Sequence, residues 1–484
     1  AGKLGIGFTD TNTKVGNTAL DSLTTGTHNT AVGENALTAS TTGSHNVAVG
    51  SGALDANTTG NYNYALGKDA LGANTTGSVN VAIANALGSN TTGENNIAIG
   101  SNSLNDNTTG GQNVALGRQA LGDNTTADNN TAVGHNALFY NTTGGNNTAI
   151  GRDALKANTT ASNSVAIGYF ALVGNTTGTQ NIAIGVETLD ANTTGSYNVA
   201  VGKAALGGNT TANYNTAVGQ GALSANTTGE YNAAVGSFAL DANTTASANT
   251  AVGYNALTAN TTGHSLCSFG TYALQSSTTG DSNSAFGRSA LQNNSTASDN
   301  SAFGKDALKA NTTGSSNNSF GAESMTTNTT GNQNCAFGRQ SLKTNNGNYN
   351  NGFGHQTLEL NTTGSQNQAF GLNSLFANTT GSYNSAFGHA ALTANTTADN
   401  NSAFGNQTLG SNTTGSNNTA FGAEALEQTT TGSQNVAVGY QALHVNSTGG
   451  SNTAIGNYAL DACTTSSELT AVGLNALGSV TSGV

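Results

Sequence analysis

The sequence of 484 residues contains no proline and no tryptophan, a single methionine and three cysteines. Charged residues make up only 7% of it, whereas an ordinary globular domain carries about 25%. The net charge of −12 is spread thinly, with no basic stripe of the kind that binds nucleic acid. No apolar run approaches the roughly 18 residues of a membrane-spanning helix. We therefore expect neither a nucleic-acid partner nor a membrane span, and no conventional globular core.

A single sequence phrase recurs along nearly the whole chain, as in Asn-Thr-Ala-Val-Gly-x-x-Ala-Leu-x-x-Asn-Thr-Thr-Gly-x-x. Its first glycine falls at Gly16 and Gly33 and recurs as far as Gly473. The motif gives 28 repeats of 17 residues, except that two steps, from Ala84 to Gly100 and from Gly338 to Gly354, are one residue shorter. Both shortened repeats keep their leucine, which indicates that the leucine is a core position and the turns are adjustable.

Each repeat has the same polar and apolar pattern when its positions are numbered from this glycine as zero. Leucine occupies position +4, a small residue position +3, an apolar residue position −1 and usually alanine position −2. Position −1 is phenylalanine in ten consecutive repeats, from Phe269 to Phe421. Asparagine is typical of positions −4 and +7, and two threonines follow the second asparagine.

This pattern predicts an all-β fold, a parallel β-solenoid (β-roll) of about 28 rungs. Seventeen residues are too few for a helix–turn–helix repeat of about 34, but they suffice for one coil containing a short strand and two turns. One coil cannot bury its own leucine, so the coils must stack to form a core. We assign residues 1–11 to an N-terminal lead-in or cap and residues 12–484 to one continuous solenoid.

The repeat positions also predict which residues form the interior. We expect the leucine and phenylalanine rows to form the core ladder and the asparagines at +7 to bond to their copies one rung away, as in amide ladders. Replacing Phe337 with alanine would then cost about 3–5 kcal/mol. The core ladder comprises Leu37, Leu54, Leu71, Leu104, Leu240, Leu308, Phe269, Phe286, Phe303, Phe337, Phe387 and Phe421, and the corner asparagines include Asn57, Asn74, Asn107, Asn192, Asn311 and Asn412.

The strand motif resembles a known repeat family. Residues 163–168, Asn-Ser-Val-Ala-Ile-Gly, are similar to the core of the head repeats of trimeric autotransporter adhesins. The longer phrase, with its additional Asn-Thr-Thr-Gly corner, also resembles repeats of phage tail-fibre and bacterial surface proteins. The resemblance covers residues 12–484 and implies a parallel β-roll, trimeric association and a role in adhesion.

No cluster of residues suggests catalysis, a cofactor or a metal. The histidines His135, His355 and His389 fall at position +1, where we interpret them as exposed turn residues. Cys267 and Cys335 share position −3 four repeats apart, about 19 Å in a stack, which is too far for a disulfide. The sequence therefore predicts free thiols and a protein that is not an enzyme.

Two repeated surface features allow alternatives. Asn-Thr-Thr matches the N-glycosylation sequon at Asn57, Asn74, Asn90 and Asn107, although the repeat explains these residues as solenoid corners. The regular threonine pairs are also typical of ice-binding solenoids. Because the two threonines are adjacent, a strand would direct them to opposite sides.

These observations favour a structural or adhesive protein of an extracellular or cell-surface fibre. Its main partner would be itself, either end to end in a filament, because the last repeat ends in phase as an exposed template, or laterally in a trimer. A cell-surface receptor or a glycan would be a further partner. The alternatives are a phage tail-fibre shaft, which would be located on a virion, and an ice- or glycan-binding solenoid.

Overall fold

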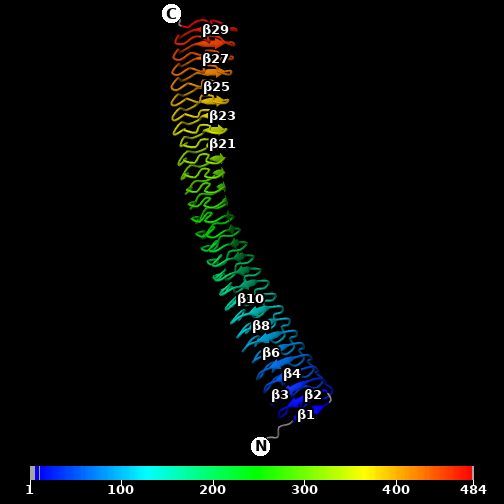
Figure 1. Ribbon diagram of the computed structural model, residues 1–484. Coiled ribbons are helices and arrows are strands. Elements are labelled where there is room, and N and C mark those ends of the chain that lie inside the picture. The colour runs from blue at the N-terminus through cyan, green and yellow to red at the C-terminus, as the bar shows by residue number, and fades with distance from the viewer. Residues whose placement is uncertain (1–5, 10, 482–484) are drawn as a thin grey trace. The chain divides into compact units, whose positions relative to one another are not determined.

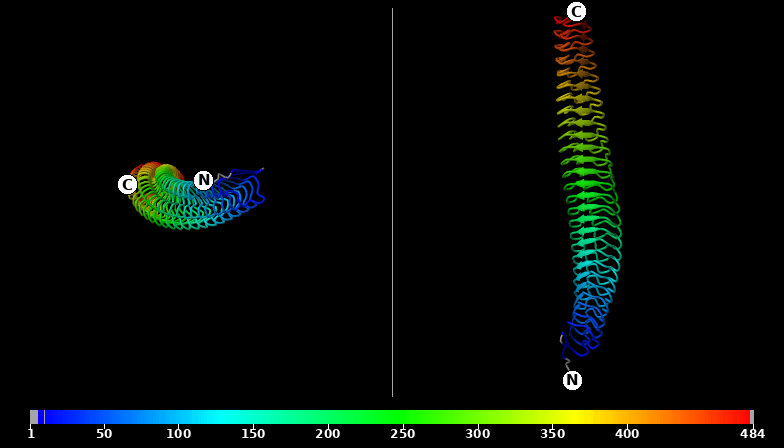
Figure 2. Two further views of the ribbon diagram at one scale, coloured as in Figure 1. Left: turned by 90° about the horizontal axis from the view of Figure 1, so that it is seen from below. Right: turned by 90° about the vertical axis from the view of Figure 1, so that its right-hand side faces the viewer.

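The computed structural model describes residues 6–9 and 11–481 and shows an all-β, parallel β-solenoid with a repeat of about 17 residues. No helix occurs in these two ranges, and so none is long and apolar enough to cross a membrane. The chain divides into two compact units, residues 1–245 and 246–484. In each unit the rungs lie one above another, with the strands in one column and the turns beside them (Figures 1 and 2).

Unit 1 begins with an antiparallel hairpin of β1 (Ile6–Thr9) and β2 (Asn12–Val15). From β2 onward each strand pairs in parallel with the next. The strands after β2 are β3 (Thr30–Val32), β4 (Val47–Val49), β5 (Tyr64–Leu66), β6 (Val81–Ile83), β7 (Ile97–Ile99), β8 (Val114–Leu116), β9 (Thr131–Val133), β10 (Thr148–Ile150), β11 (Val165–Ile167), β12 (Ile182–Ile184), β13 (Val199–Val201), β14 (Thr216–Val218) and β15 (Ala233–Val235).

Unit 2 has the same organisation, and its strands pair only in parallel within the described residues. Its strands are β16 (Thr250–Val252), β17 (Cys267–Phe269), β18 (Ser284–Phe286), β19 (Ser301–Phe303), β20 (Asn318–Phe320), β21 (Cys335–Phe337), β22 (Asn351–Phe353), β23 (Gln368–Phe370), β24 (Ser385–Phe387), β25 (Ser402–Phe404), β26 (Thr419–Phe421), β27 (Val436–Val438), β28 (Thr453–Ile455) and β29 (Thr470–Val472).

The repeat register is kept from rung to rung, so equivalent residues lie directly above one another. In β18 and β19, for example, Ala285 pairs with Ala302 and Phe286 with Phe303. Side chains alternate along a strand, and in nearly every three-residue strand after β2 only the middle residue is buried. Position −2 therefore faces the interior, and positions −3 and −1 face outward.

The interior of each rung is narrow and is filled mainly by leucine and alanine. The leucine at +4 and the alanines at +3 and −2 have almost no exposed surface, as in Leu308, Ala307 and Ala302. The leucine adopts a left-handed backbone conformation, with φ +49° at Leu308, which costs a leucine energy. Its amide donates to the carbonyl of the next rung, Leu308 to Ser324 at 3.0 Å, and its buried side chain offsets that cost.

Candidate functional site

The corner asparagines lie inside the coil, where they form an amide ladder from rung to rung. Asn74 Nδ2 donates to Asn57 Oδ1 at 2.8 Å and to the Gly77 carbonyl at 2.9 Å. The asparagine at −4 reaches the same carbonyl from the other side, because Asn63 Nδ2 donates to Gly77 at 2.9 Å. Gly77 thus joins the two asparagine rows. All six corner asparagines named above have no exposed surface.

The ladder is interrupted where the sequence replaces an asparagine. Asn412 Nδ2 donates to Asn395 Oδ1 at 3.1 Å, but Thr429 occupies the equivalent corner one rung later. Asn412 Oδ1 and Thr429 Oγ1 are buried with no hydrogen-bond partner among the described residues. An unpaired buried acceptor is costly, so this corner is a local weak point of unit 2.

Burial of these asparagines bears directly on glycosylation. A glycan is attached to the amide nitrogen, and Asn57, Asn74, Asn90 and Asn107 have fully buried, hydrogen-bonded amides. We expect an N-glycosyltransferase to leave the purified folded chain unmodified, as intact mass spectrometry would show. A synthetic peptide of one repeat is the matched control and should be glycosylated. Glycan on the folded chain at these asparagines would contradict the assignment.

The phenylalanine row does not belong to the core, and this part of the sequence prediction is wrong. Phe269, Phe286, Phe303, Phe337, Phe387 and Phe421 all lie at position −1, on the outer side of the sheet. Three of them, Phe269, Phe337 and Phe421, expose 37%, 38% and 43% of their surface. The reason is spatial, because the leucine at +4 already fills the interior opposite the strand and only alanine fits between. Phe337→Ala should therefore cost less than about 3 kcal/mol, since it leaves no closed cavity.

The ten phenylalanines of unit 2 form one stacked row on this outer face. Neighbouring rings from Phe269 to Phe421 lie 4.5–5.0 Å apart, and their planes differ by at most 8°. Because each ring face is covered by its neighbours, the row presents ring edges to its surroundings. A partner would therefore meet an apolar ridge, and sugar rings would find few free ring faces to stack on.

The other outward position of these strands, position −3, carries no charge. Position −3 in the ten phenylalanine-bearing strands is serine, cysteine, asparagine, glutamine or threonine, as in Ser284, Cys267 and Gln368. Positions −3 and −1 of β16 to β29 contain no charged residue, although the chain carries a net charge of −12. We call positions −3 and −1 of β17 to β26 the outer ridge.

The equivalent face of unit 1 is also apolar. Here both outward positions are mostly aliphatic, and a shallow apolar groove is lined by Val47, Tyr64, Leu66, Val81 and Ile83. Tyr64 and Leu66 are about half exposed, at 49% and 51%. Apolar surface of this extent is unusual on a monomer that stays monomeric.

The threonine pairs present only one regular row of hydroxyl groups to solvent. The first threonine is part-buried, and its hydroxyl donates to the next rung, as Thr58 Oγ1 does to the Thr75 carbonyl at 3.0 Å. The second, such as Thr59 or Thr76, is exposed. The adjacent residues thus do face different ways, and a single row offers less than a two-dimensional array for binding a crystal surface.

Most charged groups lie on the turns. Lys305 and Lys309 both contact Asp306, at 3.6 and 3.3 Å. Burial, together with the nearby charge of Glu187, raises the pKa of the Asp190 carboxyl group. These groups face solvent on the turn and do not converge on a cleft.

The three cysteines are free thiols. Cys267 and Cys335 are part-buried on the outer ridge, and burial raises the pKa of both thiols, which makes them less reactive at neutral pH. Cys463 is fully buried at a corner position usually held by asparagine. Of the +1 histidines, His389 Nδ1 lies 3.1 Å from Asn406 Oδ1.

No protein-family model matches the chain, and the comparison with curated proteins gives no significant match. The functional argument therefore depends on the surface of the solenoid itself.

Proposed function

We propose that the protein is a non-catalytic structural or adhesive component of an extracellular fibre, and that its chains associate laterally through the outer ridge. The observation that carries this proposal is the row of ten stacked phenylalanines on the outer face of unit 2, three of which expose more than a third of their surface and seven of which are part-buried. Partly exposed ring edges that recur on ten successive rungs form a contiguous apolar surface, and such a surface is typical of a protein–protein contact.

A second copy of the chain is the occupant that best fits this surface. The outer ridge carries no charge, so it lets two chains of net charge −12 approach without desolvating ions at the contact. The side chains at −3 are polar but uncharged, so they can be covered by the ring edges of another copy without burying an ion. The rung spacing is identical in every copy, so contacts made at one rung repeat at the next.

Lateral association is better supported than end-to-end stacking at the N-terminal side of unit 1. There β1 pairs antiparallel with β2, from Ile6 opposite Val15 to Thr9 opposite Asn12. Because β1 occupies that edge, another chain cannot add a parallel rung directly onto β2. A tail-fibre shaft would use the same lateral contacts, so this proposal includes it as one setting for the fibre.

Charge placed on the outer ridge should abolish association. We expect the wild-type chain to form dimers or trimers at micromolar concentration in sedimentation velocity experiments. The double variant Phe337→Glu with Phe370→Glu should sediment as a monomer, because each carboxylate would be desolvated in the interface. Circular dichroism should show that the fold of this variant is retained.

The matched control places the same charges on the turns. Leu360 and Leu372 expose 40% and 42% of their surface and occupy positions +6 and +1, which are not part of the outer ridge, so Leu360→Glu with Leu372→Glu should associate as the wild type does. A wild-type chain that stays monomeric at tens of micromolar, or a ridge variant that associates normally, would overturn the proposal.

A further inference from the structure

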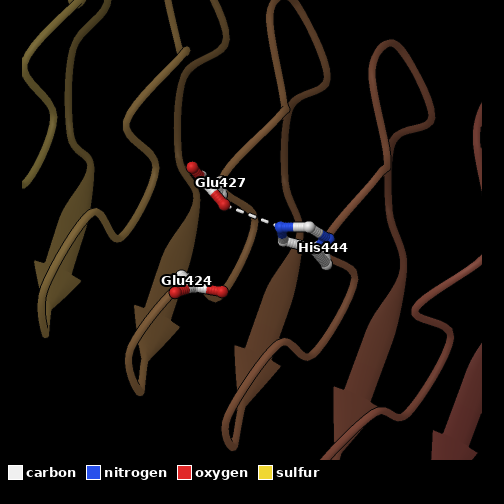
Figure 3. A group of neighbouring side chains, drawn as sticks. All are labelled: Glu424, Glu427 and His444. Carbon is white, nitrogen blue, oxygen red and sulfur yellow. Dashed lines mark hydrogen bonds and ion pairs between the residues drawn. The ribbon is translucent and has the colours of Figure 1, made fainter.

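Three metal-ligand side chains from two successive rungs meet on the turns of unit 2 (Figure 3). Glu424 and Glu427 follow β26 at positions +2 and +5, and His444 follows β27 at position +5. One ligand atom from each lies within 4.8 Å of the other two, and all three residues are part-buried. His444 Nε2 lies 2.6 Å from Glu427 Oε2.

This cluster has no basic residue to balance its charge. The sequence contains neither lysine nor arginine from residue 344 to residue 484. Some acidic residues elsewhere on the turns are paired with lysine, as Glu359 is with Lys343 at 3.6 Å. The negative charge of Glu424 is the largest cause of the raised pKa of the Tyr440 hydroxyl. With no lysine or arginine in this part of the sequence, His444 is the one side chain of the cluster that can carry a positive charge.

The hydrogen bonds of the cluster leave ligand positions free. Gln441, one rung above Glu424 at the same position, donates its Nε2 to Glu424 Oε2 at 2.6 Å. Glu424 Oε1 and Glu427 Oε1 make no hydrogen bond that would have to be broken, within the residues that the structure describes. Each glutamate can therefore offer its Oε1 to a cation, and the hydrogen bond between His444 Nε2 and Glu427 Oε2 gives way when that nitrogen becomes a ligand.

We propose that Glu424, Glu427 and His444 bind a divalent transition-metal ion, with Zn²⁺ as the best fit. One imidazole and two carboxylates are suitable ligands for Zn²⁺ at about 2.0–2.2 Å, and water completes the coordination of a three-ligand site that is open to solvent. A harder ion such as Ca²⁺ prefers six to eight oxygen ligands, which this turn does not supply. The ion would bridge two rungs and replace the missing basic partner.

Unit 1 contains a natural counterpart that lacks the imidazole. Glu187 and Asp190 occupy the same +2 and +5 positions of one rung, but the next rung carries Ala204 and Gly207 there. Glu187 and Asp190 show that the solenoid can hold an acidic pair at these two positions without a histidine in the next rung. We therefore assign metal affinity to His444 and expect none at the unit 1 pair.

Calorimetric titration of the full, chelator-treated chain with Zn²⁺ tests the proposal. We expect one ion per chain at micromolar affinity, and a Co²⁺ complex whose absorption lacks sulfur-to-metal charge-transfer bands. The variant His444→Gln should weaken binding at least about tenfold. Because Gln441 above Glu424 already shows that a glutamine can donate to the glutamate below, this variant should keep the fold.

His389→Gln is the matched control, since His389 lies on a turn of the same unit and contacts an asparagine. It should bind Zn²⁺ as the wild type does. Failure of the wild type to bind below millimolar Zn²⁺, or undiminished binding by His444→Gln, would overturn the proposal. Neither result bears on lateral association, which is measured without metal.

Discussion

Replacing Leu375 with alanine should lower the local free energy of unfolding by about 2–5 kcal/mol. Leu375 has no exposed surface, and its amide donates to the Ala391 carbonyl at 3.0 Å. The rungs above and below hold the backbone in place, so the coil cannot collapse into the space that the side chain leaves. Native-state hydrogen exchange of the surrounding amides, together with chemical denaturation followed by circular dichroism, would measure the loss.

The same substitution three residues earlier in the same rung is the control. Leu372 exposes 42% of its surface, so Leu372→Ala should change stability by no more than about 0.5 kcal/mol. Because solenoid stability is close to a sum of repeat and nearest-neighbour terms, the loss in Leu375→Ala should be concentrated in the adjacent rungs. Equal losses in the two variants would show that position +4 is not the core.

The repeat length and the leucine row are readable from the sequence because both are imposed by stacking. A coil of 17 residues can bury its leucine only against its copies, and the two shortened repeats keep Leu87 and Leu342 despite the lost residue. The orientation of the strand is not readable in the same way. Alanine at −2 and phenylalanine at −1 are both apolar and equally periodic, so either could face inward.

The width of the coil decides between them. Leucine at +4 approaches the strand from the opposite side, which leaves room for Ala302 but not for Phe303. Periodicity describes which residues are equivalent, but it does not say which side of the strand they face. The same limit applies to the cluster of Glu424, Glu427 and His444, because residues 17 positions apart become neighbours only when the exact register is known.

For the corner asparagines, the sequence predicts the amide–amide hydrogen bond between rungs but not that these side chains are buried. The amide ladder requires only that identical residues stack one rung apart, as Asn294 and Asn311 do at 2.8 Å. A polar turn would normally be placed at the surface. Here Asn311 has no exposed surface, because its amide also satisfies the Gly314 carbonyl at 2.9 Å. A polar corner can therefore be part of the interior when every donor has a partner.

Replacing Gly202 with alanine should destabilise its rung by about 3 kcal/mol or more. Gly202 has φ +129°, which L-residues rarely adopt, and an added Cβ would lie 2.7 Å from the carbonyl carbon and oxygen of Gly219 one rung above. Neither atom can move without breaking the register of the strand that precedes it. We expect a lower midpoint of thermal unfolding and faster hydrogen exchange on both sides of the rung.

Gly207→Ala in the same rung separates this steric effect from the general effect of replacing glycine. Gly207 does not have a left-handed φ, and its added Cβ would come no closer than 3.3 Å, to the flexible Asp190 carboxylate. Alanine there should be neutral or should stabilise by up to about 1 kcal/mol, because it restricts the unfolded chain. If Gly202→Ala were as well tolerated as Gly207→Ala, close stacking at position zero could not be what requires glycine. If Gly202→Ala is destabilised and Gly207→Ala is not, the recurring glycine is required by the close backbone contact between rungs. The same contact sets the spacing of the rings on the outer ridge.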